Sequence, residues 1–451
     1  MYKAHGMDLL FVLVSGQSHM VQCEPQEARQ KMTTTEKTKT AEQQIAEKET
    51  RIMDAIRMRI PDRVPVICSL GYFVAKYTGT PHSAAYYDFP AWLAAYKKTI
   101  PDFPADLVFV QGFTPGTALE ILKPHQLRWP GYNLDRYSSQ QSVEVENMRA
   151  DEYDAFLRDP TDYKLRVNLS RAADDLGGLA ELPNLSELGW GSGGAQQLAL
   201  ALSSPKVARS ISILQKTGRE LRKFQKRQAQ FAQMLLDMGV PQYTQYAAMP
   251  PYDLLSFGIR GMSGLMTDMF RQPDKVLAAC DKILQMTLDR PVPKTNKFGN
   301  IRVFMTVTRG SDNFLSKNQF EKFYWPTFSK LVHSLVDKGM TPCIFFEGDC
   351  DSRMEYLLDF PKGSILVHVD RTDIFRAKDI LRNHLCIQGN VPSTLLQAGS
   401  VQDVKDYCKK LIDYVGKGGG FILSPRSSTE SVRPQNLKAM IEFTKEYGVY
   451  R

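Results

Sequence analysis

The side chains best suited to chemistry stand at the ends of two apolar runs in the C-terminal part of the chain. In FFEGDCDSR (345–353), Glu347 follows Phe345 by two residues, and in ILVHVDRTD (365–373), Asp370 follows His368 by two. Because alternate residues of a β-strand point to the same face, the two members of each pair share a face. Neighbouring strands that end in inward-pointing polar side chains form a site, and such strand ends carry the chemistry in α/β barrels.

Two kinds of chemistry fit these residue types. Glu347, His368 and Asp370, with Cys350 in the loop between them, could hold zinc through N, O and S ligands. The same carboxyl groups could instead act as general acid and base. Because a buried carboxylate without a partner is costly, we expect a cation, a proton or a substrate between the two strand ends. His368 could alternatively be a satisfied core histidine.

The order of apolar runs predicts the elements that position these residues. Strands are expected at 64–68, 106–110, 301–307, 342–346, 364–369, 385–389 and 420–424, and helical segments between the last five at 318–339, 352–360, 375–383 and 401–418. Strict alternation of strand and helix is typical of a parallel sheet covered by helices. Regular spacing without a GxGxxG motif favours a closed barrel over a dinucleotide-binding sheet. The triple glycine at 418–420 is expected to stop a helix before a tight turn.

Composition and charge exclude several classes of protein. The chain has 451 residues, of which 43% are hydrophobic, and a net charge of +8. Much of this charge lies in GRELRKFQKRQAQ (218–230), which is typical of a solvated helix face and lacks the interleaved aromatic residues and the recognisable module of a nucleic-acid stripe. Seven scattered cysteines without a CxxC pair indicate a reducing compartment, here the cytoplasm.

The N-terminal residues predict a leader outside the folded domain. The apolar stretch MDLLFVLVSG (7–16) is too short to span a bilayer, and its flanks fit a secretory signal poorly, although a weak signal peptide stays the alternative. Residues 27–50 are polar and rich in Thr, Lys, Glu and Gln. We expect a disordered or over-extended leader over 1–45, a functional chain that begins near Met32, and one barrel domain over 46–451.

Two further segments are candidates for binding a substrate. The loop HQLRWPGYNLDRY (125–137) combines Arg128 and Trp129 with two tyrosines and a Pro-Gly turn, and could cover an aromatic substrate or pack on the barrel rim. The segment TRGSD (308–312) follows a strand, and its Arg309 or Asp312 could contact a ligand or only cap the helix that begins near Ser316.

Several longer segments resemble one family. RIMDAIRMRIPDRVPV (51–66), PADLVFVQG (104–112), PPYDLLSFGIRG (250–261), CIQGNVPSTLLQAGSVQDVKDYC (386–408), GGGFILS (418–424) and RPQNLKAMIEFTKEYG (433–448) resemble the uroporphyrinogen decarboxylase superfamily. That superfamily contains the decarboxylase of haem biosynthesis and a branch of cobalamin-dependent methyltransferases. The resemblance implies a (β/α)8 TIM barrel with a helical N-terminal elaboration and a site at the C-terminal ends of the strands.

The details of the resemblance distinguish the two branches. Decarboxylases of the family use arginines after the first strand, whereas this chain has CSLGYFVAKY (68–77) there, without arginine. Recognition of many carboxylates without guanidinium donors is physically implausible. Asp106 does match the acidic residue that holds the pyrrole nitrogens in the decarboxylases. Zinc-dependent methyltransferases of the family carry HxC and a later Cys where this chain has Phe345, Glu347 and Ser427 or Ser428.

The resemblance therefore implies a corrinoid-dependent methyltransferase. It would move a methyl group between a small O-, N- or S-methyl compound, or a folate-type carrier, and a cobalamin presented by a partner corrinoid protein, with no nucleic-acid partner. Glu347, Asp370 and Asp106 would be catalytic, and zinc would be held by Glu347, His368, Asp370 and Cys350. The alternatives are uroporphyrinogen decarboxylase activity and a non-catalytic barrel in a multi-component methyl-transfer system.

Overall fold

Helix α1 (Ala41–Ile56) is the first element of the computed structural model, which describes residues 39–110, 112–291, 299, 301–427 and 429–451. Thr40 begins the helix with a reciprocal capping box, in which its hydroxyl accepts from the Gln43 amide and the Gln43 side chain accepts from the Thr40 amide. The helix starts inside the expected leader, ahead of the boundary at 46. Residues 1–38 of that leader, including Met32, lie outside the described residues.

The central element is a parallel sheet of six strands in the order β10-β9-β8-β7-β6-β5, accompanied by a parallel pair β1-β2 and a small antiparallel pair β3-β4. The strands are β1 (Ile67–Ser69), β2 (Leu107–Phe109), β3 (Leu127–Arg128), β4 (Gln141–Ser142), β5 (Tyr246–Ala247), β6 (Ile301–Val307), β7 (Met340–Phe346), β8 (Leu366–Val369), β9 (Cys386–Val391) and β10 (Phe421–Pro425). Each of the seven predicted strands is present, whereas the two-residue strands β3, β4 and β5 were not predicted.

Two isolated bridges join the parallel pair to the six-stranded sheet. Val66, just before β1, pairs with Leu423 of β10, and Val108 of β2 pairs with Gln242, just before β5. At these two seams the described residues pair through single bridges rather than continuously, so among them the strands do not form one closed sheet. The prediction of an α/β fold with a parallel sheet is confirmed, and full closure into a (β/α)8 barrel stays a prediction.

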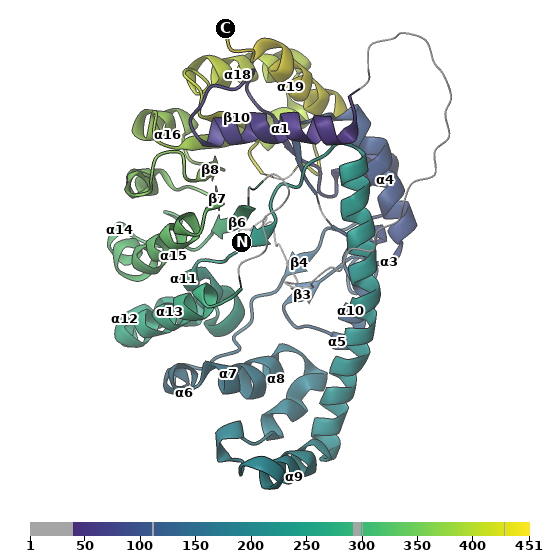
Figure 1. Cartoon of the computed structure of the whole chain (residues 1–451), viewed down its shortest axis with the longest axis vertical. Coiled ribbons are helices and arrows are strands. Elements are labelled where there is room, and N and C mark those ends of the chain that lie inside the picture. The colour runs from purple at the N-terminus through teal and green to yellow at the C-terminus, as the bar shows by residue number, and fades with distance from the viewer. Residues whose placement is uncertain (1–38, 111, 292–298, 300, 428) are drawn as a thin grey trace.

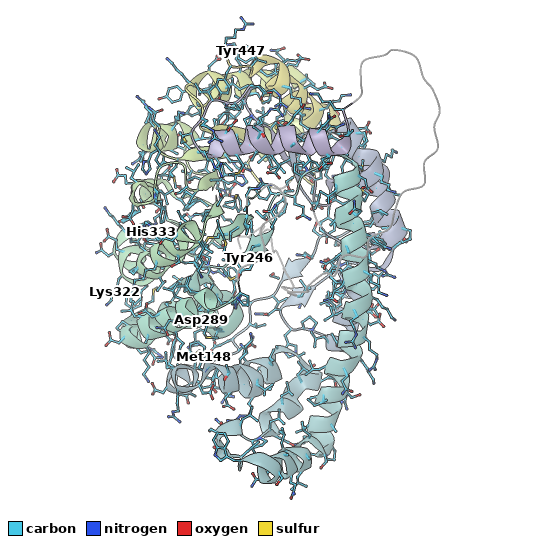
Figure 2. All side chains as sticks on the ribbon, in the orientation of Figure 1. Met148, Tyr246, Asp289, Lys322, His333 and Tyr447 are labelled. Carbon is cyan, nitrogen blue, oxygen red and sulfur yellow. The ribbon has the colours of Figure 1, made fainter. Side chains whose placement is uncertain are left out.

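Helices cover the outside of the sheet, as Figure 1 shows for α13, α15, α16, α18 and α19. Those that follow the strands from β5 onward are α11 (Pro251–Leu254), η4 (Leu255–Arg260), α12 (Met262–Arg271), α13 (Pro273–Leu288), α14 (Lys317–Gln319), η5 (Phe320–Tyr324), α15 (Trp325–Asp337), η6 (Asp351–Asp359), α16 (Ile374–Leu381), α17 (Ser393–Ala398), α18 (Val401–Tyr414) and α19 (Pro434–Tyr447). The four predicted helical segments correspond to α14–η5–α15, η6, α16 and α18. Side chains such as Lys322 and His333 lie on the outer face of this layer, whereas Tyr246 lies toward the sheet (Figure 2).

The largest helical elaboration lies between β2 and β5, not at the N-terminus. Before and within it are α2 (Phe73–Thr78), α3 (Ala84–Tyr87), α4 (Phe89–Asp102), α5 (Gly116–Leu122), α6 (Tyr153–Arg158), α7 (Pro160–Asp162), η1 (Tyr163–Asn168), α8 (Leu169–Ala172), η2 (Asp174–Glu181), η3 (Leu185–Glu187), α9 (Gly191–Leu202) and α10 (Pro205–Asp237). α10 contains the basic run 218–230, which is helical as expected. It runs along one side of the molecule from α9 up to α1 (Figure 1). A small separate core of Ala173, Leu176, Leu179, Leu182 and Val207 stabilises this region.

Helix α1 packs on the N-terminal end of the strands. Its buried Ile52, Met53 and Ile56 join the inward-facing side chains of the sheet in one core cluster, which includes Cys343 and Ile422. Glu49 forms a fully buried ion pair with Arg302 of β6, whose guanidinium nitrogens lie 2.5 and 2.9 Å from the carboxylate oxygens. Helix α1 therefore covers the N-terminal end of the strands with apolar side chains and one buried ion pair.

The glycines at 418–420 form the expected tight turn between α18 and β10. All three have positive φ angles, 80°, 84° and 64°. A Cβ at Gly420 would lie 2.3 Å from the Met58 side chain, so α1 and this turn approach each other closely. In the part of the chain that the structure describes, no helix combines the length and apolar character that a bilayer crossing needs.

Candidate functional site

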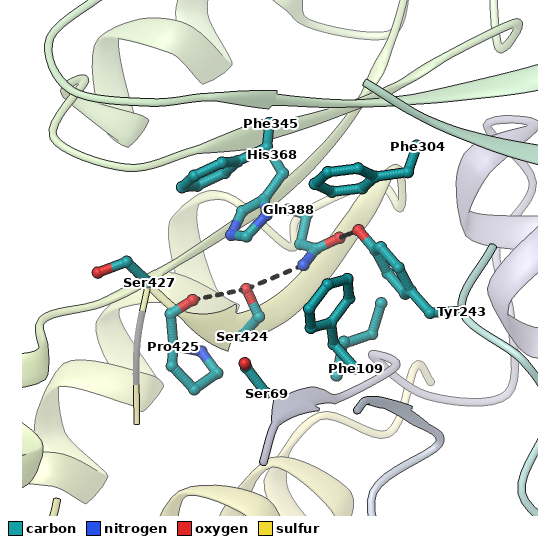
Figure 3. Close-up of a pocket in the computed structure, with 11 residues that line it drawn as sticks. Ser69, Phe109, Tyr243, Phe304, Phe345, His368, Gln388, Ser424, Pro425 and Ser427 are labelled. Atoms are coloured by element: carbon teal, nitrogen blue, oxygen red, sulfur yellow. Dashed lines mark hydrogen bonds between the residues drawn. The ribbon is translucent and has the colours of Figure 1, made fainter. Parts of the chain in front are cut away.

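A small cavity lies inside the sheet, toward the C-terminal ends of the strands (Figure 3). Its free volume is about 20 Å³, roughly the space that one ordered water requires. The lining side chains come from strands or from residues adjoining them, and they are Ile67, Ser69, Phe109, Tyr243, Phe304, Phe345, His368, Gln388, Ser424, Pro425 and Ser427. Aromatic rings from one side thus face a polar edge contributed by β8, β9 and β10.

A chain of hydrogen bonds forms that polar edge. The Tyr243 hydroxyl donates to Gln388 Oε1 over 3.0 Å, and Gln388 Nε2 donates to Ser424 Oγ over 3.3 Å. Ser424 Oγ in turn donates to the Pro425 carbonyl over 3.0 Å. All three side chains are buried, and Figure 3 shows them in line along one wall. Each of these three donors therefore has an acceptor, which holds the three side chains in one arrangement.

His368 borders the cavity from β8, and its ring packs against Phe345 with 4.6 Å between the centroids. Burial lowers the pKa of His368 to about 4. Hydrogen bonds with the backbone groups of Pro425 and Arg426 act in the opposite direction and partly offset this lowering of the pKa. The imidazole is therefore neutral near pH 7. Its Nε2 atom is buried and has no hydrogen-bond partner among the described residues. A buried imidazole nitrogen without a partner is an unused donor or acceptor aimed at the site.

The two strand-end carboxyl groups follow neighbouring strands, since β7 pairs with β8 and places Phe345 opposite His368, and neither group is among the residues that line the cavity. Glu347 Oε2 accepts a hydrogen bond of 2.8 Å from the Thr308 hydroxyl at the end of β6. Asp370 is only 9% exposed, and its Oδ2 accepts from the Gly348 amide over 3.0 Å. The structure thus brings Glu347, His368 and Asp370 to one end of the sheet, as the alternation of the strands predicts.

Burial sets the protonation behaviour of Asp370. It raises the pKa of Asp370 above the usual range of an aspartate, while the Gly348 amide and the charges of Arg426 and Arg371 act in the opposite direction. Arg426 follows β10, and its Nε atom is buried without a hydrogen-bond partner among the residues that the structure describes. Asp370 therefore binds a proton more readily than an exposed aspartate does. The Arg426 Nε atom is a donor that could bind a polar group of a ligand.

The four predicted zinc ligands do not form a metal site in this structure. No three His, Cys, Asp or Glu side chains gather as a metal-binding group anywhere in the described ranges. Cys350 is fully buried, its amide donates to the Thr372 hydroxyl, and its thiol faces the Glu347 carbonyl at 3.9 Å. Burial raises the pKa of the Cys350 thiol well above its usual value. The donors therefore do not fit zinc, and we derive no step through it.

Asp106 lies apart from the other predicted catalytic residues. It directly precedes β2, at the N-terminal end of the strands, where its carboxylate pairs with Arg51 at 2.8 Å and with Arg63 at 2.6 Å. The Val66 amide donates a further hydrogen bond of 2.9 Å. The desolvation of Asp106 is more than offset by these partners, which hold the pKa of the carboxyl below its usual range. Its contacts join α1, β1 and β2, and they do not reach the cavity.

The three predicted substrate-binding residues do not line the cavity either. Arg128 lies in β3 and is exposed, while Trp129 is buried under Tyr132, with parallel rings 4.8 Å apart, and donates to the Tyr87 hydroxyl. The Arg309 guanidinium lies between the rings of Phe257 and Phe314, at 4.4 and 4.8 Å from their centroids. The interpretation of the 125–137 loop as packing on the rim agrees with these contacts.

Several site residues were not identified from the sequence. Gln388 and Ser424 lie on predicted strands, and the same alternation that singled out His368 and Asp370 would have found them. Thr308, which holds Glu347, and Arg426 each follow a strand directly. Tyr243 precedes the two-residue strand β5, which is too short to produce a periodic signal.

The C-terminal part of the chain is similar to a known protein family. Residues 247–447 match the family model described as uroporphyrinogen decarboxylase. The chain is 26% identical over 161 residues to the uroporphyrinogen decarboxylase of Chlorobium phaeobacteroides, and 24% identical over 186 residues to that of Geobacter sulfurreducens. These matches cover 33% and 41% of this chain, and 45% and 53% of the two relatives, so the chain spans about half the length of the relatives it matches.

A solved methyltransferase from Methanosarcina mazei shares the fold over most of the molecule. The two structures superpose with a TM-score of 0.54 at 13% sequence identity, covering 89% of this chain and 98% of the other. At this identity the likeness concerns the fold alone. Together with the family model and the relatives, it confirms the predicted resemblance of this chain to the uroporphyrinogen decarboxylase superfamily.

Proposed function

We propose that this chain is a methyltransferase that passes a methyl group between a small O-, N- or S-methyl compound, or a folate-type carrier, and a corrinoid bound to a separate partner protein. The observation that carries the proposal is the pair of carboxyl groups at adjacent strand ends, one of which, Asp370, is buried and has a raised pKa. Such a group can deliver a proton to a leaving heteroatom. The complete (β/α)8 barrel is part of this proposal.

Asp370 acts as the acid in the proposed chemical step. The bond between the methyl carbon and its heteroatom breaks, the carbon bonds to the reduced corrinoid cobalt, and the electron pair that stays on the heteroatom takes the proton of Asp370. The corrinoid supplies the nucleophile and arrives as cargo of the partner. Glu347, held by Thr308, would orient the methyl compound, and the unused Arg426 Nε would bind the polar group next to it.

The nature of the cavity wall favours this reaction over porphyrinogen decarboxylation. A substrate with many carboxylates needs several guanidinium or ammonium donors. Among the described residues, those that line the cavity include neither Arg nor Lys, and β1 contributes Ser69. Decarboxylation remains the alternative because the relatives that the chain matches are described as uroporphyrinogen decarboxylases.

Substitution of the two carboxyl groups tests the proposal. We expect Asp370→Asn to lower kcat for methyl transfer by about 10² to 10⁴, the usual contribution of a general acid. Glu347→Gln should lower kcat by about 10² with KM within about twofold of the wild type, because a group that orients the methyl compound acts mainly on the transition state. Asp379→Asn on α16 is the matched control, since Asp379 is an aspartate on the outer surface. An Asp370→Asn protein with undiminished kcat would overturn the proposal.

A further inference from the structure

Asp253 of α11 is a buried carboxylate outside the cavity. It is 1% exposed, and it forms no ion pair with any residue that the structure describes. Burial raises the pKa of Asp253 to about 6, against the hydrogen bonds that it accepts. A buried carboxylate without a cationic partner is costly, so its retention needs a reason.

Three donors converge on this carboxylate. The Tyr324 hydroxyl donates to Oδ2 over 2.6 Å, and the backbone amides of Arg309 and Thr308 donate to the two oxygens over 2.8 and 3.4 Å. Both oxygens must accept, which an asparagine side chain cannot provide because its amide nitrogen is a donor. Aspartate is therefore the residue that this arrangement of donors requires.

The segment that Asp253 holds leads directly to the proposed active site. The Thr308 amide donates to Asp253, and the Thr308 hydroxyl donates to Glu347 Oε2 over 2.8 Å. The turn is packed closely against Tyr324, because a Cβ at Gly310 would lie 2.7 Å from the tyrosine ring. Its other end is held by the Arg353 Nε atom, which donates to the Gly310 carbonyl over 3.0 Å.

We infer that Asp253 is a positioning residue, which together with Tyr324 fixes the turn after β6 and through Thr308 sets the orientation of the Glu347 carboxylate. The inference rests on the proposed function for the role of Glu347. The position of Glu347 itself can be measured without any methyl transfer. Among the described residues, Asp253 forms no hydrogen bond with a residue that lines the cavity, so it acts through Thr308 rather than on a substrate.

Two substitutions and one matched control separate positioning from general stability. Asp253→Asn and Tyr324→Phe each remove part of the contact. Tyr153→Phe is the control, because Tyr153 also donates to a buried aspartate, Asp268, over 3.0 Å, and among the described residues this pair bonds neither Thr308 nor Glu347. A loss of stability alone would affect all three variants alike.

The first readout is structural. Amide hydrogen exchange at Thr308 and Arg309 should accelerate about tenfold or more in Asp253→Asn and Tyr324→Phe, because these amides lose their acceptor or its support. The titration midpoint of the Glu347 carboxyl, followed with ¹³C-labelled glutamate and assigned with Glu347→Gln, should move in both variants. Tyr153→Phe should change neither. Unchanged exchange and an unchanged Glu347 titration in Asp253→Asn and Tyr324→Phe would overturn the inference.

The second readout is methyl transfer. We expect kcat to fall about 10- to 100-fold in Asp253→Asn with KM within about twofold of the wild type, since displacement of a positioned group by a fraction of an ångström acts mainly on the transition state. Normal kcat in a variant with a shifted Glu347 would also overturn the inference. Wild-type protein without methyl transfer would contradict the proposed function alone, and the structural readout would then decide the role of Asp253.

Discussion

Two carboxyl side chains at the ends of neighbouring strands differ in their surroundings, and this difference assigns their roles. Glu347 accepts from the Thr308 hydroxyl, which fixes its orientation. Asp370 is buried beside the Gly348 amide, and burial raises its pKa. A pair of carboxyl groups in unlike environments is the usual arrangement when one holds a proton and the other orients a substrate. The neutral His368 adds a polar atom without adding a charge.

The raised pKa of Asp370 predicts the direction of the pH profile. The protonated acid is the active form, so kcat for methyl transfer should fall as the pH rises through the pKa of Asp370. Asp370→Asn should remove this limb, because an asparagine does not titrate. The measurement is kcat against pH for both proteins, with Asp379→Asn as control. A descending limb that persists in Asp370→Asn would show that another group supplies the proton.

Strand alternation was sufficient to place some site residues and not others. It brought Glu347, His368 and Asp370 together because side chains two residues apart on a strand must share a face. It could not show that the Cys350 thiol turns to the Glu347 carbonyl, since the loop after β7 has no periodicity. Asp106 matched a family pattern by position, but its environment of Arg51 and Arg63 depends on how α1 packs, which the local sequence does not reveal.

At the scale of elements, α1 is the helix that closes the N-terminal end of the strands. Its apolar side chains enter the same core cluster as the inner face of the sheet, and its Glu49 neutralises Arg302 inside that core. The sequence suggested that residues 27–50 are a polar leader because their composition is polar. Tertiary packing outweighs that composition from Ala41 onward, since the polar stretch carries a capping box and buries Ile45 and Glu49.

The buried ion pair predicts a large difference between two glutamates of the same helix. Glu49→Gln should lower the free energy of unfolding by about 3–5 kcal/mol, because it leaves the Arg302 charge buried without its counter-ion. Glu47→Gln should change it by less than about 0.5 kcal/mol, since Glu47 pairs with Lys39 at the surface. Urea denaturation of the two variants measures both values. Equal stabilities would contradict a structural role for the pair.

The strands themselves were predictable to the extent that they are long and apolar. Five neighbouring strands of the sheet, β6 to β10, were all expected from near-continuous apolar runs. β5 has two residues, and the segment between β2 and β5 carries helices α5 to α10. The amphipathic patterns of those helices do not reveal that they form one insertion between two strands. The order of elements in space depends on contacts between residues far apart in the sequence.

At the scale of the whole molecule, the six-stranded sheet and the pair β1-β2 are joined at single bridges. β6 and β7 pair over seven positions, whereas the bridges Val66–Leu423 and Val108–Gln242 stand alone. Short ladders open at lower free energy than long ones. We expect amide hydrogen exchange in 105–110 to be faster than in 340–346, measured on the native protein by mass spectrometry. Equal protection in the two segments would show that the barrel is continuous in solution.

The most direct test of the account is methyl transfer from a panel of O-, N- and S-methyl compounds and methylated folate to free cob(I)alamin, followed by absorbance. The account predicts transfer from at least one donor by the wild-type protein, with a loss of about 10² or more in Asp370→Asn. Absence of transfer from every donor, together with formation of coproporphyrinogen from uroporphyrinogen by the same preparation, would contradict it.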